Sequence, residues 1–122
     1  MIYASTTRAL ACLETLVHFD AGVKLPLNRY LVRIDIPAES WKQRRRFGPL
    51  GDHPGWDAEP PGRTSQDFGS LWAAENKSLL LEVPSIVVEE ESNILINPKH
   101  ADVSRVRAQI MRKWTYDTRL RP

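Results

Sequence analysis

The sequence is poor in several features that would place it in a specialised class of protein. It contains a single cysteine, Cys12, which excludes an intramolecular disulfide and a zinc site built from several thiolates. No apolar run approaches the roughly 20 residues that a membrane-spanning helix needs. No basic segment followed by an apolar core opens the chain, so no secretory signal is visible. Because the charges of 17 basic and 15 acidic residues nearly cancel, the overall charge does not indicate a nucleic-acid-binding protein. We therefore expect a cytoplasmic protein without a membrane partner.

The motifs of several enzyme classes are also missing. The sequence has no glycine-rich dinucleotide fingerprint, no P-loop, no H-E-x-x-H, no C-x-x-C and no G-x-S-x-G. His18, His53 and His100 are far apart along the chain, so we expect no metal site. The composition is 42% hydrophobic and 26% charged over 122 residues, which is typical of one globular domain.

The N-terminal part of the chain predicts an amphipathic helix. Ser5 or Thr6 is suited to cap it, because a side-chain hydroxyl can accept a bond from a backbone N–H. At about 100° per residue the apolar side chains form one stripe, with Leu10 at its edge and Glu14 just beyond Leu10. The members of the stripe are Ala9, Cys12, Leu13, Leu16, Val17 and Phe19. We expect the helix to end at residues 20–22.

Two strands and a long loop complete the first half. Residues 2–3 are β-prone, and strict alternation over residues 30–36 predicts a half-buried strand that Pro37 closes. Residues 41–62 are rich in proline and glycine and predict a long loop. This loop begins with the basic run K-Q-R-R-R at residues 42–46, which we interpret as a solvated charge run. A nucleic-acid patch is the alternative, but no interleaved aromatic side chains support it, and we do not expect direct nucleic-acid binding.

The second half predicts a mixture of helices and short strands. Thr64 or Ser65 can cap a helix on which Phe68, Leu71 and Trp72 share one face. The remaining segments are strands at 79–83, 85–88 and 93–96, an exposed turn at 89–92, an amphipathic helix at 100–114 and a last strand at 114–120. Strands and helices do not alternate strictly, so we expect an α/β (α+β) fold, a compact mixed sheet with three main helices.

Three polar residues lie in apolar surroundings and are candidates for chemistry. Each has an ordinary alternative. Tyr3 can be a strand aromatic with its hydroxyl at the rim, and Glu14 a boundary carboxylate that reaches solvent. Ser85, after Pro84, can be a turn residue that bonds local backbone. The residues alone leave these alternatives open.

Taken together, three stretches resemble the RES domain family, which is named after an Arg, a Glu and a Ser. They are YASTTRALACLETLVH, TSQDFGSLWAAENKSLLLEVPSIVVEEESNILINPKHADV and WTYDTRL, in the family's order from Tyr3 to Leu120. The most specific part is residues 81–100, where a strand is followed by V-P-S and then by N-x-L-x-N-P-x-H. The resemblance is weakest over residues 41–62.

The resemblance implies a fold and an activity. RES proteins are toxins of bacterial toxin–antitoxin pairs, with a fold similar to that of ADP-ribosyltransferases of the diphtheria-toxin type. They use NAD as a substrate, not as a cofactor, and split its nicotinamide–ribose bond. The ADP-ribose then passes to water, phosphate or a protein. Their partner is an antitoxin with an Xre-like DNA-binding region, which blocks the NAD pocket. A homodimer is an assembly that the sequence leaves open.

The resemblance also implies roles for the three candidates. Glu14 matches the family's Glu and Ser85 its Ser, while Tyr3 matches the aromatic of a Y-x-S strand. Loss of nicotinamide leaves a ribosyl cation, which a carboxylate such as Glu14 can stabilise. Tyr3 can stack on the nicotinamide ring, and Ser85 can donate to the nucleotide or orient Glu14.

One part of the family pattern has no counterpart here. The family's Arg normally precedes the Y-x-S strand, whereas only Met1 and Ile2 precede Tyr3, and Arg8 follows the strand. We therefore expect one RES-like domain over residues 1–122 that lacks this Arg-containing segment. Two hypotheses follow: an NAD-consuming toxin enzyme, or an inactive module that only binds its antitoxin.

Overall fold

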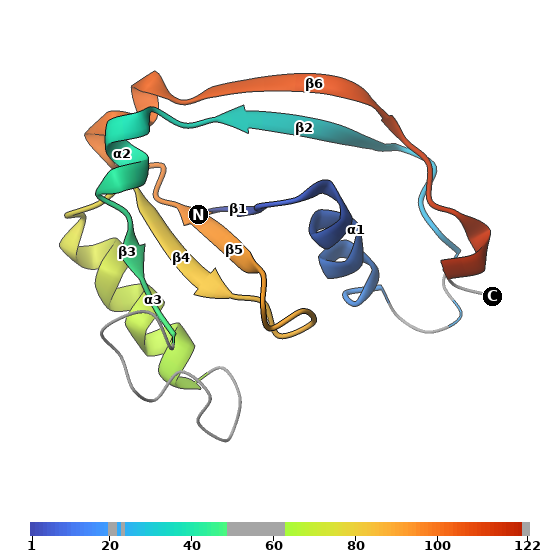
Figure 1. The fold of residues 1–122 in the computed structure, drawn as a ribbon, viewed down its shortest axis with the longest axis horizontal. Helices are drawn as coiled ribbons and strands as arrows, with labels where there is room; N and C mark the ends of the chain where they lie inside the picture. Colours follow the sequence, from blue (N-terminus) through green and yellow to red (C-terminus); the bar gives the residue numbers. More distant parts are fainter. Residues whose placement is uncertain (20–21, 23, 49–62, 121–122) are drawn as a thin grey trace.

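The computed structural model describes residues 1–19, 22, 24–48 and 63–120 (Figure 1). The strands are β1 (Ile2–Ser5), β2 (Arg29–Asp35), β3 (Arg45–Arg46), β4 (Leu80–Pro84), β5 (Ser92–Ile96) and β6 (Arg107–Trp114). The α-helices are α1 (Arg8–Leu16), α2 (Ala38–Lys42) and α3 (Arg63–Glu75), and two short 3-10 helices are η1 (Ala101–Arg105) and η2 (Thr118–Leu120). This mixture confirms the expected α+β class.

The larger sheet has four strands in the order β1-β5-β4-β3. β5 pairs antiparallel with β1 and β4, while β3 pairs parallel with β4. α3 contributes to the core on one face, where the buried cluster is Phe47, Trp72, Leu81 and Leu95. The opposite face holds Leu79, Leu80, Ile94 and Ile96, with Ile34, Ile36, Val103 and Val106 packed against them. Full burial of one such side chain contributes about 2 kcal/mol, so these two clusters hold the sheet in place.

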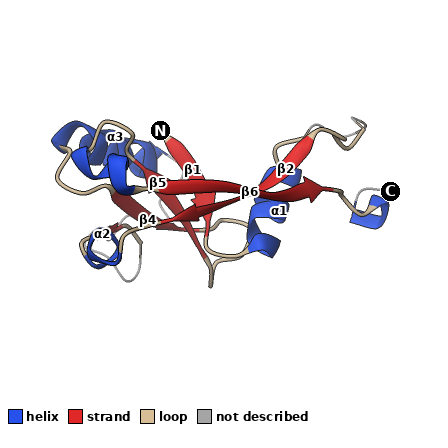
Figure 2. Ribbon diagram, turned by 90° about the horizontal axis from the view of Figure 1, so that it is seen from above, coloured by secondary structure: helices blue, strands red, loops and turns tan. Residues whose placement is uncertain are grey.

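β2 and β6 form a separate antiparallel ribbon of two strands. The ribbon passes over β1 and β5 and extends beyond α1 (Figures 1 and 2). A two-stranded ribbon is marginally stable by itself, so its contacts at both ends matter. At one end Ile34 packs on the larger sheet. At the other, Tyr116 meets Phe19 edge-on, with ring centroids 6.0 Å apart.

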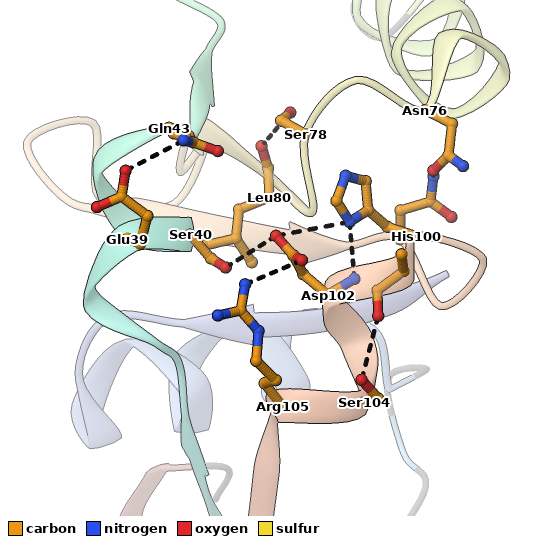
Figure 3. Close-up of polar contacts among 12 residues, drawn as sticks. Glu39, Ser40, Gln43, Asn76, Ser78, Leu80, His100, Asp102, Ser104 and Arg105 are labelled. Carbon is orange, nitrogen blue, oxygen red and sulfur yellow. Dashed lines mark hydrogen bonds and ion pairs between the residues drawn. The ribbon is translucent and has the colours of Figure 1, made fainter.

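A polar cluster connects α2 to η1 at the start of β6, and Figure 3 shows Asp102 at its centre. Ser40 Oγ donates to Asp102 Oδ2 at 3.3 Å, and Arg105 Nη2 lies 2.9 Å from Asp102 Oδ1. His100 Nδ1 accepts the backbone N–H of Asp102 at 3.1 Å. The hydrogen bond from Arg105, assisted by the charges of Arg105 and His100, holds the pKa of Asp102 below its usual value. The cluster fixes where the chain turns into the ribbon.

The helix predicted at residues 100–114 was wrong. The chain forms η1 and then β6, and the last strand predicted at 114–120 is replaced by coil and η2. Val103 and Val106 pack against the core as predicted, but Ile110 is 66% exposed and pairs with Val32 across the ribbon. Pairing with β2 overrides a helical periodicity that is correct only for its first turn.

Smaller corrections concern loops and helix ends. The loop predicted from residue 41 contains the end of α2 and all of β3, and its residues 49–62 lie outside the described residues. No strand forms at residues 85–88. α3 begins at Arg63, ahead of both predicted caps. α1 ends at Leu16 rather than at residues 20–22, and Thr7 is its cap.

The buried face of α1 overlaps the predicted apolar stripe but is rotated toward Leu10. Leu10, expected at its edge, is buried together with Leu16, whereas Ala9 and Val17 are exposed. The burial of Leu10 moves the buried face toward Glu14, which the stripe had left outside. α1 therefore turns the carboxylate of Glu14 toward the larger sheet.

Candidate functional site

The carboxylate of Glu14 is held by side chains from two other parts of the chain. Ser85 Oγ donates to Glu14 Oε1 at 2.6 Å, and Asn93 Nδ2 donates to the same oxygen at 2.8 Å. Ser5 Oγ in turn donates to Asn93 Oδ1 at 2.6 Å. We call Ser5, Glu14, Ser85 and Asn93 the Glu14 cluster. It joins β1, α1, the end of β4 and β5.

Ser85 is fully buried, and the loop after β4 winds around its hydroxyl. The backbone N–H groups of Val87 and Val88 donate to Ser85 Oγ at 3.1 and 3.0 Å. The N–H of Ser85 donates to the carbonyl of Glu91 at 2.9 Å, which closes the loop. Two N–H donors occupy the oxygen's lone pairs, so its only hydrogen points to Glu14. The loop geometry therefore makes the hydroxyl of Ser85 a hydrogen-bond donor to Glu14.

The orientation of Asn93 follows from the same reasoning. An ionised carboxylate only accepts hydrogen bonds, so the amide must turn its NH₂ group toward Glu14. Its carbonyl oxygen then receives the hydroxyl of Ser5, its direct partner across β1 and β5. Asn93 is 2% exposed, and both ends of its amide are satisfied.

Glu14 itself is half-buried, and its two oxygens differ. Both hydrogen bonds reach Oε1, while Oε2 accepts none from any residue that the structure describes. Thr7 fixes the start of the helix that carries Glu14, because its hydroxyl accepts the N–H of Leu10 at 3.1 Å. One oxygen is therefore anchored by two donors, and the other has no donor among the described residues.

Tyr3 lies on the same side of β1 as Ser5, since the two residues are two positions apart in a strand. Its side chain is 62% exposed. Partial burial raises the pKa of the Tyr3 hydroxyl, and the negative charge of Glu14 raises it further. Tyr3 is thus a protonated donor within electrostatic reach of the carboxylate.

A cleft of about 610 Å³ lies beside this cluster, between the larger sheet and the ribbon. Tyr3 and Ser5 line it, together with the first residues of α1 and the inner side of β2. Glu14 and Ser85 are not among its lining residues. The cleft therefore adjoins the Glu14 cluster through Ser5 and does not contain it.

The structure brings the three predicted residues together, with one difference. Glu14 and Ser85 are in direct contact, and Tyr3 is a neighbour coupled by charge. Ser85 also bonds local backbone, as the turn interpretation expected. Ser5 and Asn93 were missed, although two signals were present: Ser5 shares the face of Tyr3 by alternation, and Asn93 opens the N-x-L-x-N-P-x-H stretch.

The basic run at residues 42–46 is not the solvated charge run that we predicted. Arg44 and Arg46 reach Glu82 Oε1 at 2.7 and 3.1 Å, and both arginines are half-buried. Arg44 also lies over the ring of Trp41, 4.1 Å from its centroid. Part of the run therefore belongs to the β3–β4 junction, while Lys42 and Gln43 are exposed.

Two searches within the described residues found nothing. No group of three or more His, Cys, Asp or Glu is arranged to hold a metal ion. Nor does any described helix have the length and apolar character that crossing a membrane requires.

Comparison with known proteins gives consistent matches. The profile of the RES domain matches residues 1–119. A Prs ADP-ribosylating toxin of Sphingobium sp. is 51% identical over 120 residues, which cover 98% of this chain and 74% of that protein. A Toxin Res of Pseudomonas putida is 31% identical over 121 residues, covering 98% of this chain and 79% of that protein. A Toxin Res of Yersinia enterocolitica is 30% identical over 106 residues, covering 81% and 62%.

Proposed function

The chain belongs to the RES domain family, and we propose that it is an ADP-ribosylating toxin that takes NAD as its substrate. The observation that carries the proposal is the pair of donors, Ser85 Oγ and Asn93 Nδ2, on one oxygen of Glu14. Such a pair fixes a carboxylate in a half-buried place. This is the group that a reaction passing through a ribosyl cation needs.

The proposed reaction breaks the bond between nicotinamide nitrogen and C1′ of the ribose. The bonding electrons leave with nicotinamide, and the ribose becomes a cation that resembles the oxocarbenium state of glycoside cleavage. Glu14 Oε2 accepts a ribose hydroxyl and stabilises the positive charge, while Oε1 stays on Ser85 and Asn93. A nucleophile then bonds to C1′ and loses its proton. The acceptor is water, phosphate or a protein side chain.

Tyr3 supplies an aromatic surface beside the carboxylate. Its exposed ring can stack on nicotinamide and hold the ring at the angle at which the bond breaks. The rest of the dinucleotide would extend into the adjoining cleft of about 610 Å³, a size suited to a ligand of this class. Tyr3 and Ser5 line that cleft and so connect it to Glu14.

A toxin needs a partner that keeps it inactive. The relatives carry toxin names, and we propose an antitoxin, of the Xre-like type that the sequence resemblance implies, as the partner of this chain. Occupation of the cleft would block NAD without any change in the Glu14 cluster.

The proposal is tested by incubating the purified chain with NAD and following nicotinamide release. Glu14→Gln keeps the shape of the side chain but removes its charge. We expect its rate to fall about 100-fold or more, as for other groups that stabilise charge in a transition state. Glu75→Gln, at the exposed end of α3, is the matched control and should keep the parental rate.

Both the reaction products and a negative result of the NAD assay distinguish the possible functions. Free ADP-ribose, ADP-ribose phosphate or labelled protein identifies the acceptor. If folded protein leaves NAD intact but binds its antitoxin, the chain is the inactive module instead. Equal rates for Glu14→Gln and Glu75→Gln would remove Glu14 from the mechanism.

A further inference from the structure

A second cavity lies next to the larger cleft, where α1 faces the end of the ribbon that holds Arg29 and Trp114. Its volume is about 120 Å³. Residues 8, 11, 12 and 15 of α1 line it, at the spacing of one helix face, and Glu14 is not on that face. The opposite wall comes from β2 and β6 and from Tyr116. This cavity is distinct from the Glu14 cluster.

We propose that this cavity is a binding site for a phosphate group, held by Arg8, Arg29 and Trp114. All three side chains line the cavity. Arg29 is the direct partner of Trp114 across the ribbon, so these two side chains lie on the same face. Arg8 approaches from the first turn of α1. A bound phosphate would therefore connect the helix to the ribbon.

The first argument is unused hydrogen-bonding capacity. In the described part of the chain, Trp114 Nε1 is buried and has no hydrogen-bond partner. A buried donor without a partner is costly, and an indole N–H can only donate. A small rotation of the indole toward the cavity would let an anion there accept this bond, whereas a cation or an apolar ligand could not accept it.

The second argument is charge. No carboxylate lines the cavity, and neither Arg8 nor Arg29 forms an ion pair or side-chain hydrogen bond with a described residue. A third arginine, Arg112, lies over the ring of Trp114 at 4.7 Å from its centroid and adds positive charge nearby. Guanidinium groups bind phosphate by two parallel charge-assisted bonds.

The third argument is geometry. Two arginines and one tryptophan line the cavity from α1, β2 and β6. Donors on separate walls suit the oxygens of a tetrahedral anion better than a planar carboxylate, which a single arginine satisfies. The volume admits a phosphate group but not a whole nucleotide. Arg8 also lines the larger cleft, so the phosphate can be free or can belong to a nucleotide there.

The test follows the indole N–H resonance of Trp114 in the ¹⁵N-labelled chain, identified by its loss in Trp114→Phe. Sodium phosphate is titrated against sodium chloride at constant ionic strength. We expect a saturable shift with phosphate and none with chloride. Arg8→Gln and Arg29→Gln should each weaken phosphate about tenfold or more, since each removes charge-assisted bonds. Arg107→Gln removes the same charge from β6 outside the cavity and should leave the affinity unchanged.

A shift that chloride reproduces, or an affinity for phosphate that is unchanged in Arg29→Gln, would overturn the proposal. ADP-ribose separates the two sources: if it competes with phosphate, the site serves a nucleotide, and if it does not, the site takes free phosphate. Glu14→Gln should bind phosphate normally, because no member of the Glu14 cluster lines this cavity. Failure of this site and failure of the NAD reaction can therefore be told apart.

Discussion

Asn93 is the residue whose loss best separates the function of the Glu14 cluster from its stability. Asn93→Leu keeps the volume but removes the donor to Glu14 and the acceptor for Ser5. We expect nicotinamide release to fall at least tenfold and the free energy of unfolding to fall by about 1–3 kcal/mol, the cost of stranding buried polar groups. NAD turnover and urea unfolding of the same samples measure both effects.

Asn97→Leu is the control for that variant. Asn97 is buried just after β5 and bonds Asn76 and the carbonyl of Ala73, away from Glu14. The Asn97→Leu variant should be less stable than the parent, but it should keep the parental rate of NAD turnover at a temperature where it is folded. Equal loss of turnover in both variants would show that Asn93 acts only through the fold.

The same residues show what sequence reasoning reaches at this scale. Glu14 and Ser85 could be named because each interrupts an apolar run, and they are indeed in contact. Ser5 and Asn93 were missed, because both have ordinary strand positions and the signals that they carry do not name a partner. Their importance arises from a bond between residues 88 positions apart, which no local pattern records.

At the scale of elements, Glu82 ties β4 to the basic residues around β3. Its side chain is 13% exposed. Burial raises the pKa of Glu82, but hydrogen bonds from Arg44 and Ser92 and the charges of Arg46 and Arg44 outweigh it and hold this pKa below its usual value. A carboxyl with a lowered pKa stabilises the fold above its unfolded pKa, and this contribution is lost as pH falls through the folded pKa.

Glu82→Gln should therefore lower the free energy of unfolding by about 1–2 kcal/mol at neutral pH. The difference between parent and variant should shrink as the pH falls below the usual range of glutamate and through the lowered pKa of the folded parent. Urea unfolding at several pH values measures it. A difference that stays constant down to pH 2 would mean that the ion pairs contribute nothing and that packing alone is affected.

Helices and strands could be predicted from the sequence where hydrophobic burial decides the local structure. β4 and β5 are continuous apolar runs, and both were found. The segment that becomes β6 has Val103, Val106 and Ile110 at helical spacing, and only the tertiary pairing with β2 makes it a strand. β3 is two residues long and exists through its pairing with β4, so it has no signal of its own.

At the scale of the whole molecule, the two sheets differ in burial, and we expect the ribbon to open more often than the four-stranded sheet. The four-stranded sheet is buried on both faces, whereas Tyr30, Val32, Ile110 and Met111 of the ribbon are exposed. Native-state hydrogen exchange should show the slowest amides in β4 and β5, near Leu81 and Leu95. Amides of β2 and β6 should exchange faster. Equal protection of both sheets would indicate that they open as one unit.

The mixed sheet was foreseen, but its division into two was not. The prediction of one compact sheet followed from the number of strands and their order. The ribbon separates because β6 returns to β2, across more than half of the described chain, instead of joining β1 or β3. Such long-range pairing is decided by which strands meet, and a single sequence does not contain that information.

The distance along the chain between the partners of Glu14 has a consequence for protein synthesis. Ser85 and Asn93 follow Glu14 by 71 and 79 residues. A nascent chain on the ribosome therefore cannot hold this carboxylate until Ser85 and Asn93 have been synthesised and have emerged. Copies whose translation stops before residue 85 lack both donors to Glu14.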